Sequence, residues 1–135
     1  GVAFNQNAHS IERELERLER KVESGANFVQ TQPIFSTDGL ERLANFLKNK
    51  KIPIIVSILP LTSGRNAEFL HNEIPGIKIP KKIRDIMKNA GNSKKAREEG
   101  IAIARDMLAS AKELAQGACI MPQLGKFDMV EKILY

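Results

Sequence analysis

The sequence predicts an α/β fold with parallel strands, and three observations support this. Short apolar segments alternate with helical patterns along the 135 residues, at a spacing of about 34 residues. The segment 52–59 is almost wholly apolar and rich in β-branched residues, as is typical of a parallel strand covered on both faces. The length suits one ordinary domain, but it is also about half of a (βα)8 barrel, which needs ~250 residues. No linker or low-complexity stretch divides the chain, so we expect residues 1–135 to form a single segment.

The expected elements follow the order β-α-β-α-β-α-α-α-β-α. We expect strands at residues 2–4, 28–32, 52–59 and 118–121, where a proline follows each of the last three. We expect helices at residues 11–24, 38–49, 64–72, 81–89, 93–116 and 128–135, with a loop at 73–80.

The first two helices have the clearest local signals. In 11–24 an apolar, an acidic and a basic stripe each recur every three or four residues. Ser10 is a suitable N-cap, and Gly25 suits the left-handed residue that ends a helix. In 38–49 three leucines mark a buried face, and Asp38 with Glu41 resembles a capping box. Gly117 is expected to end the longest helix.

Polar side chains gather where the predicted strands end, for example Asn5, Gln6 and Asn7 after the first strand. Ligands of parallel α/β proteins bind at this end of the strands. Gln30 and Gln32 share one strand face by alternation, and an amide that donates and accepts in one plane suits the edge of a heterocycle. An equally favoured interpretation is that both glutamines only bond to loop backbone.

The net charge of +5 comes from one segment, because residues 78–97 hold eight basic residues and one acid. A solvated helix surface explains such a segment. The alternative is a basic α/β module that docks an acidic partner or RNA through residues 78–97. Only 5% of residues are aromatic and none is Trp, so stacking platforms for nucleic acid are scarce and a nucleic-acid partner is not expected.

No pattern for a metal site or a covalent nucleophile is found. The single cysteine, Cys119, lies in a predicted buried strand, so we expect an inert core thiol and a reducing, cytoplasmic location. No apolar run approaches the ~20 residues of a membrane span, so no membrane partner is expected. The basic stripe Arg13, Arg17 and Arg20, together with Lys21, could hold a phosphate, as in some other barrel enzyme. On pattern alone, salt bridges within the helix, such as Glu16 with Arg20, are the favoured explanation.

Six segments in unbroken order carry a family resemblance. They are RKVESGANF at 20–28, TQP at 31–33, ILPLT at 58–62, LHNEIPGI at 70–77, AREEGI at 96–101, and MP followed by GKF at 121–127. Together they resemble the C-terminal half of the methylenetetrahydrofolate reductase family, and the Met-Pro ending is most similar to bacterial members fused to a homocysteine S-methyltransferase domain. The resemblance implies an α/β fold that is the C-terminal half, four βα units, of a TIM (βα)8 barrel, with parallel strands and helices outside.

The same resemblance implies a function and a set of site residues. The family reduces 5,10-methylenetetrahydrofolate to 5-methyltetrahydrofolate with NAD(P)H, by hydride transfer through FAD. The implied folate-binding residues are Gln32, Asn66 and Lys126, the last in place of a usual arginine. The implied FAD-binding residues are Arg20, Lys21, Arg17, Glu14 and His9.

Some positions depart from the family pattern. Arg17 stands where an asparagine is usual, Leu70 where an aromatic residue stacks, and Asn5 where a tyrosine lies beside the flavin. Lys21 is 11 residues into its helix from Ser10, about 16 Å from the top, so only the extended adenylate end of FAD could reach it.

The resemblance places the general acid in the N-terminal four βα units, so no catalytic residue is assigned here. We therefore expect that these residues need a missing N-terminal half-barrel, or another copy of the chain, and that alone they neither bind FAD tightly nor turn over.

Overall fold

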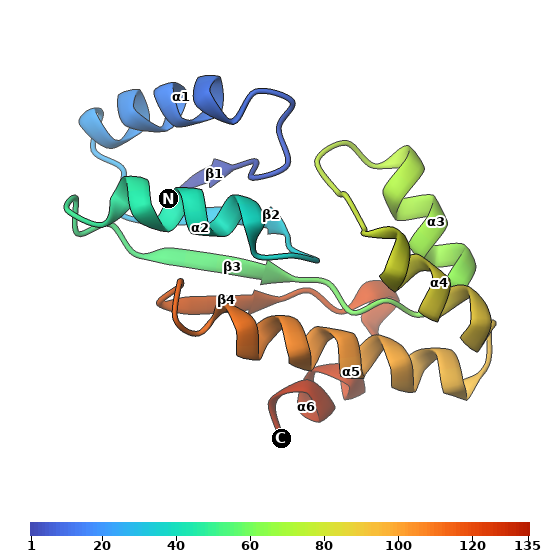
Figure 1. The fold of residues 1–135 in the computed structure, drawn as a ribbon. Helices are drawn as coiled ribbons and strands as arrows, with labels where there is room; N and C mark the ends of the chain where they lie inside the picture. Colours follow the sequence, from blue (N-terminus) through green and yellow to red (C-terminus); the bar gives the residue numbers. More distant parts are fainter.

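The computed structural model describes residues 1–135, which form a four-stranded sheet with helices along one side (Figure 1). The strands are β1 (Val2–Phe4), β2 (Val29–Pro33), β3 (Ile54–Ile58) and β4 (Gly117–Ile120). The helices are α1 (Ile11–Glu23), α2 (Asp38–Leu47), α3 (Gly64–Glu73), α4 (Lys81–Ala90), α5 (Lys94–Ala111) and α6 (Asp128–Leu134), with a short 3-10 helix η1 (Gln123–Gly125) before α6. The predicted order of strands and α-helices is confirmed.

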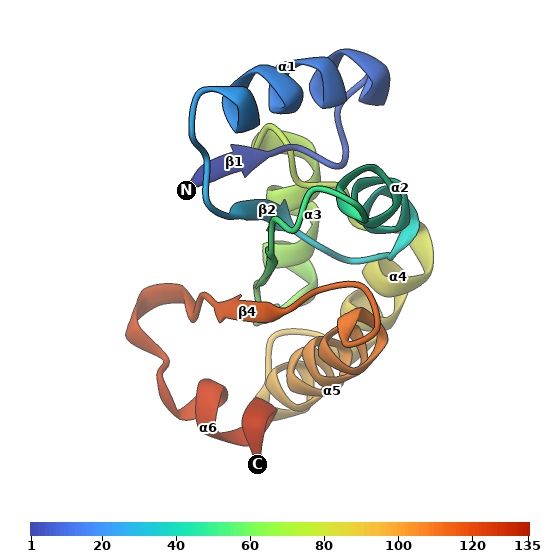
Figure 2. The ribbon, with the colours of Figure 1, turned by 90° about the vertical axis from the view of Figure 1, so that its left-hand side faces the viewer.

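All neighbouring strands are parallel, in the order β1-β2-β3-β4. In Figure 2, α2 and α5 lie over one face of the sheet, and no helix lies over the opposite face. We call the helix-covered side the outer face and the other side the open face. Four parallel strands with their helices on the outside are the architecture of half a (βα)8 barrel, as predicted, and the open face corresponds to the barrel interior.

Two apolar clusters hold the fold together. The first lies between the outer face of the sheet and α1, α2, α5 and α6, and it buries Leu18, Leu40, Leu43 and Leu47 among the strand residues. The three leucines of α2 are therefore the buried face that the sequence predicted. The second cluster joins α3 and α4 to the first half of α5 beyond the carboxyl ends of the strands, and it includes Leu70. Leu70 is buried there, so it cannot stack on a ligand.

Most element boundaries agree with the sequence to within two residues, but the end of α5 does not. The helix was expected to continue to residue 116, and it ends at Ala111. Gln116 bonds to β3 instead, with its amide 3.0 Å from the Ile54 carbonyl and its side-chain oxygen 2.8 Å from the Ile54 amide. Gly117 consequently begins β4 rather than ending the helix.

Local cap predictions had mixed outcomes. Ser10 caps α1 by accepting a hydrogen bond from the Arg13 amide, and Gly25 has a φ of 103°, as predicted. The capping box at Asp38 is wrong, because Thr37 is the N-cap of α2 and its side chain makes no capping bond. The η1 helix after Pro122 was not expected.

The two outer strands leave the sheet open at both edges. On β3 only the residues of the outer face are packed against helices, and Ile55 on the open face is half-buried, so the expectation of two covered faces is wrong for this chain. Cys119 is likewise half-buried on the open face, beside Ser57, and is not a core thiol. None of the helices combines the length and apolar character that crossing a membrane requires.

Candidate functional site

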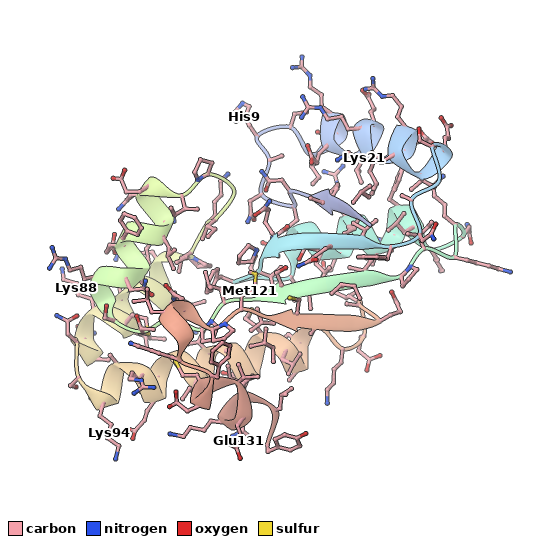
Figure 3. The ribbon with its side chains drawn as sticks, turned by 180° about the vertical axis from the view of Figure 1, so that it is seen from behind. His9, Lys21, Lys88, Lys94, Met121 and Glu131 are labelled. Carbon is pink, nitrogen blue, oxygen red and sulfur yellow. The ribbon has the colours of Figure 1, made fainter.

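A cavity of about 360 Å³ lies on the open face of the sheet. Its lining includes Ala3, Phe28, Gln30, Gln32, Ser57 and Met121. Figure 3 looks onto this face, with Met121 in front of the sheet where the strands end. The side chains that line the cavity are all uncharged, so this face offers hydrogen bonds and apolar contacts rather than ionic ones.

The two glutamines of β2 line this one cavity, as their shared face predicted. The register between β2 and β3 shifts between Gln30 and Pro33, so Pro33 lies opposite Ser57. Gln30 donates from Nε2 to the Ser57 hydroxyl at 3.1 Å. The side-chain amide of Gln32 makes no hydrogen bond within the chain, although its backbone is held on both sides. Gln32 therefore has its whole amide available for a ligand.

The backbone of Gln32 is fixed by a side chain from the neighbouring loop. Gln6 is 7% exposed, and its Nε2 donates to the carbonyls of Gln32 (2.9 Å) and Pro33 (3.2 Å). Its Oε1 accepts from the Gln32 amide at 3.1 Å. The side chain of Gln6 thus takes the place of a paired strand beyond the end of β1. The sequence identified Gln6 only as one of several polar residues after the first strand.

The loop between α3 and α4 closes over the same end of the sheet. Asn7 donates from Nδ2 to the Gly76 carbonyl at 3.0 Å, and Asn5 accepts from the Asn7 amide at 3.0 Å. Gly76 has a φ of 86°, and a Cβ there would lie 3.4 Å from the side chain of Gln32. A larger residue at this position would therefore strain the loop and crowd the predicted ligand-binding amide.

Asn66, predicted to bind folate, is paired within the chain. Its Nδ2 donates to Oε1 of Gln123 at 2.8 Å, and its Oδ1 accepts from Nε2 of Gln123 at 2.9 Å and from the Thr62 amide at 3.2 Å. This reciprocal pair links the start of α3 to η1. Lys126 follows η1, is half-buried and makes no ion pair. The Oδ1 of Asn66 is therefore occupied, and only the second hydrogen of its Nδ2 is left for a ligand, whereas the whole ammonium of Lys126 is free.

Arg20 and Lys21 border a second cavity, of about 410 Å³, at the other end of β1. Neither residue forms a salt bridge. The predicted pair of Glu16 with Arg20 is wrong, because Arg20 donates from Nε to the backbone carbonyl of Glu16 at 3.5 Å. The ammonium of Lys21 donates to the Ala3 carbonyl at 3.1 Å. Two cations without carboxylate partners in one cavity are a suitable donor set for a phosphate group.

The side chain of Lys21 brings its charge closer to the top of α1 than the distance of about 16 Å along the helix from Ser10 indicates. Side chains on a helix tilt toward its N-terminus, and this one extends up the edge of β1. Its ammonium contacts Ala3, one residue before β1 ends, which is ~3 Å along the strand. The charged group is therefore much nearer the carboxyl ends of the strands than the helix backbone indicates.

The other three residues predicted to contact FAD are not gathered around one cavity. Glu14 accepts from the Asn5 amide at 3.2 Å and pairs with Arg17 at 3.5 Å, so it holds the loop after β1 to α1. Arg17 is exposed on α1, and His9 is exposed on the loop before it (Figure 3).

Two surface carboxylates have a lowered pKa, and each owes it to hydrogen bonds. A hydrogen bond from its own backbone amide, and then one from Arg42, lowers the pKa of Glu12. A hydrogen bond from Lys81 lowers the pKa of Asp85. Both are surface carboxylates away from the open face, and no group of three His, Cys, Asp or Glu side chains lies together as metal ligands would.

Within the basic segment 78–97, half of the cations pair with carboxylates. The pairs are Lys81–Asp85, Arg84–Glu68, Lys94–Glu98 and Arg97–Asp128. These pairs favour a solvated helix surface over a polyanion-binding face.

The fold and the cavity define a class: a parallel half-barrel with a candidate ligand site on its open face. The family model for methylenetetrahydrofolate reductase matches residues 3–124, so the chain belongs to the methylenetetrahydrofolate reductase family. A search of curated proteins finds no match. A structure similar to this chain is that of an uncharacterized protein from Clostridium thermocellum that binds two copies of 5-methyl-5,6,7,8-tetrahydrofolic acid. It is 21% identical, with a TM-score of 0.64, and the match covers 99% of this chain and 50% of that one. The chain thus spans about half the length of this neighbour.

Proposed function

We propose that this chain supplies the folate-binding half of a cytoplasmic flavin-dependent reductase. The enzyme reduces 5,10-methylenetetrahydrofolate to 5-methyltetrahydrofolate with NAD(P)H. Family membership supports the reaction, and the folate ligand of the Clostridium thermocellum neighbour supports the substrate class. One observation of this structure carries the proposal. Gln32, the residue that matches the family's pterin-binding glutamine, has a fixed backbone and a free side-chain amide in the open cavity.

The chain's own residues have separable tasks in this proposal. Gln32 binds the pterin ring, and Lys126 attracts the anionic part of the folate. Arg20 and Lys21 hold the phosphates of FAD, since both cations lack carboxylate partners. When bound, FAD supplies the relay that carries hydride from NAD(P)H to the folate. The side chains that line the cavity include no acid or base, so we assign proton donation to the strands that complete the barrel.

The half-barrel needs a second half to work. Both sheet edges and the open face are unpartnered, so a substrate on the open face would be enclosed on one side only. The completing strands come from an N-terminal half-barrel, on the same polypeptide or another one, or from a second copy of this chain. The link to a homocysteine S-methyltransferase domain remains a prediction from the resemblance.

The test compares this chain alone with the complete barrel, meaning this chain together with the strands that complete it. FAD is titrated by absorbance, and NAD(P)H oxidation is followed with and without 5,10-methylenetetrahydrofolate. We expect tight flavin binding and folate-dependent oxidation only for the complete barrel. In the complete barrel, Gln32→Ala should lower kcat/KM for the folate by about 10- to 100-fold, because a polar group of the ligand loses its partner.

Gln116→Ala is the matched control, because it removes a glutamine that bonds β3 at the opposite end of the sheet. It should leave kcat/KM for the folate unchanged. A complete barrel without folate-dependent oxidation would overturn the proposed function. Stoichiometric flavin and activity in this chain alone would overturn the half-barrel proposal.

A further inference from the structure

Gln30 is the second glutamine of the open cavity, and the resemblance assigns it no role. It lies in register with Ile55 of β3, two residues before Gln32 on the same strand. Its side chain is half-buried and lines the same cavity as Gln32. Apart from Gln32, the other residues of this cavity are small or apolar. The Gln30 amide loses hydration there when the barrel closes, so a hydrogen-bond partner must replace the water.

The orientation of the Gln30 amide follows from the hydrogen-bond network. The Ser57 hydroxyl donates to the Thr31 carbonyl at 2.7 Å, and a carbonyl can only accept. The one hydroxyl hydrogen of Ser57 is therefore used, so Ser57 can only accept from Gln30. The Nε2 of Gln30 must face Ser57, at 3.1 Å, and its Oε1 must be the free end of the amide. The direction of the Gln30 amide therefore follows from the Thr31 carbonyl, which has no hydrogen to donate.

The free Oε1 has no partner in the chain, because the only hydrogen bond of the Gln30 side chain is the one that Nε2 donates to Ser57. Ser57 is 1% exposed and is itself held by the Thr31 hydroxyl, which accepts from the Ser57 amide at 3.1 Å. The acceptor is therefore presented by a buried and rigid support. A ligand in the cavity needs an N–H donor to match it.

We infer that Gln30 is a second folate-binding residue, whose Oε1 accepts a hydrogen bond from an N–H group of the pterin ring. This inference rests on the proposed function, because it takes the pterin as the occupant of the cavity. Gln32 then provides an amide with both donor and acceptor free, and Gln30 adds an acceptor of fixed direction. Together they select a flat heterocycle that carries N–H donors over one that presents only acceptors.

The experiment measures the affinity of the complete, FAD-loaded barrel for 5-methyltetrahydrofolate by calorimetry. Gln30→Leu keeps the approximate volume and removes the acceptor, and we expect a Kd about tenfold higher. Ser57→Ala keeps Gln30 but frees its amide to turn. If both orientations become equally populated, the Kd should rise only about twofold. Gln116→Leu, the same substitution outside the cavity, should leave the Kd unchanged.

Two partial ligands distinguish the loss of a direct contact with the pterin ring from a general loss of structure in Gln30→Leu. The ring alone, 6-methyltetrahydropterin, should lose the same factor in Gln30→Leu as the whole folate. The tail alone, p-aminobenzoylglutamate, should bind Gln30→Leu and the unchanged protein equally. Equal losses for the ring and the tail would show a structural role and overturn the inference.

The outcomes distinguish this inference from the proposed function. If the unchanged barrel binds the folate and Gln30→Leu binds it equally well, the inference is wrong and the proposed function stands. If the unchanged barrel binds no folate, the proposed function fails and the inference fails with it.

Discussion

At the scale of single residues, Gln6 contributes more to the structure than its position in a loop suggests. Its amide makes three hydrogen bonds to the backbone of Gln32 and Pro33, where β2 extends beyond its neighbour β1. A Cβ on Gly39 would lie 2.4 Å from the carbonyl oxygen of Gln6, so the start of α2 packs directly on this loop. Gln6 therefore joins the end of β2, the loop after β1 and the start of α2.

Replacing Gln6 with alanine should destabilise the chain by about 2–4 kcal/mol, because an amide and two carbonyls of the backbone lose their partners while largely buried. Urea unfolding followed by circular dichroism measures the change. The single-bond control is Gln116→Ala, for which about 1 kcal/mol is expected. Equal losses of stability in the two variants would show that the three hydrogen bonds of Gln6 stabilise the chain no more than the single bond of Gln116.

At the scale of elements, α5 is held against the rest of the fold by a very close approach. A Cβ on Gly100 would lie 1.8 Å from the carbonyl oxygen of Leu61, in the segment that joins β3 to α3. A Cβ on Gly64 would similarly lie 2.8 Å from the Cα of Lys88, so α3 and α4 also touch through a glycine. These contacts bring the second apolar cluster close to the carboxyl ends of the strands.

Gly100→Ala tests this packing. The substitution has two effects on stability, and they have opposite signs. Alanine favours a helix by about 1 kcal/mol over glycine, whereas overpacking against backbone costs about 1–3 kcal/mol or more. We expect a net loss of stability, seen as a lower Tm by calorimetry. Ser110→Ala on the exposed side of the same helix should stay within about 0.5 kcal/mol of the unchanged chain. A Tm that rises in Gly100→Ala would mean that the helix is free to move away.

At the scale of the whole molecule, the open edges of the sheet offer sites where the isolated chain can pair with another copy of itself. The Val2 amide donates to the Phe28 carbonyl, directly before β2. Because the backbone groups of successive strand residues point to opposite sides, the carbonyl of Ala3 points away from the sheet. Lys21 covers this carbonyl with its ammonium. Lysines at strand edges oppose pairing with another strand, because pairing would bury the charge.

Lys21→Met should therefore increase self-association of the isolated chain, which light scattering after size-exclusion chromatography measures over a range of concentrations. Lys95→Met is the control, because Lys95 is exposed on α5 away from both sheet edges. We expect a concentration-dependent rise in mass for Lys21→Met only. If both variants stay at the mass of the unchanged chain, the edge of β1 is protected by something other than Lys21.

The sequence predicted those parts of the molecule that depend on local patterns. The order of strands and α-helices, the three buried leucines of α2 and the cap at Ser10 all follow from spacing within about ten residues. Features that depend on distant partners could not be read in this way. The early end of α5 requires the bonds between Gln116 and Ile54, and the pairing of Asn66 requires Gln123, 57 positions away.

The candidate site likewise combines features that the sequence predicts with features that it does not. That Gln30 and Gln32 share a cavity follows from strand alternation, although the register shift between them could not be foreseen. The direction of the Gln30 amide depends on hydrogen bonds to Ser57 and from Ser57 to Thr31, which the sequence does not reveal. The hydrogen bond from Lys21 to Ala3 could not be predicted either, because the position of a residue on a helix does not determine where a long side chain ends.

The uncharged lining of the open cavity has a consequence for how such an enzyme evolves. Since the side chains that line this cavity carry no titratable group, substrate affinity contributed by them is insensitive to acidity. A shift in the pH optimum must then arise from the completing strands, from the cofactor or from the folate itself. Selection for a new pH optimum and selection for a new pterin-like substrate would thus act on different halves of the barrel, and each half could change without undoing the other.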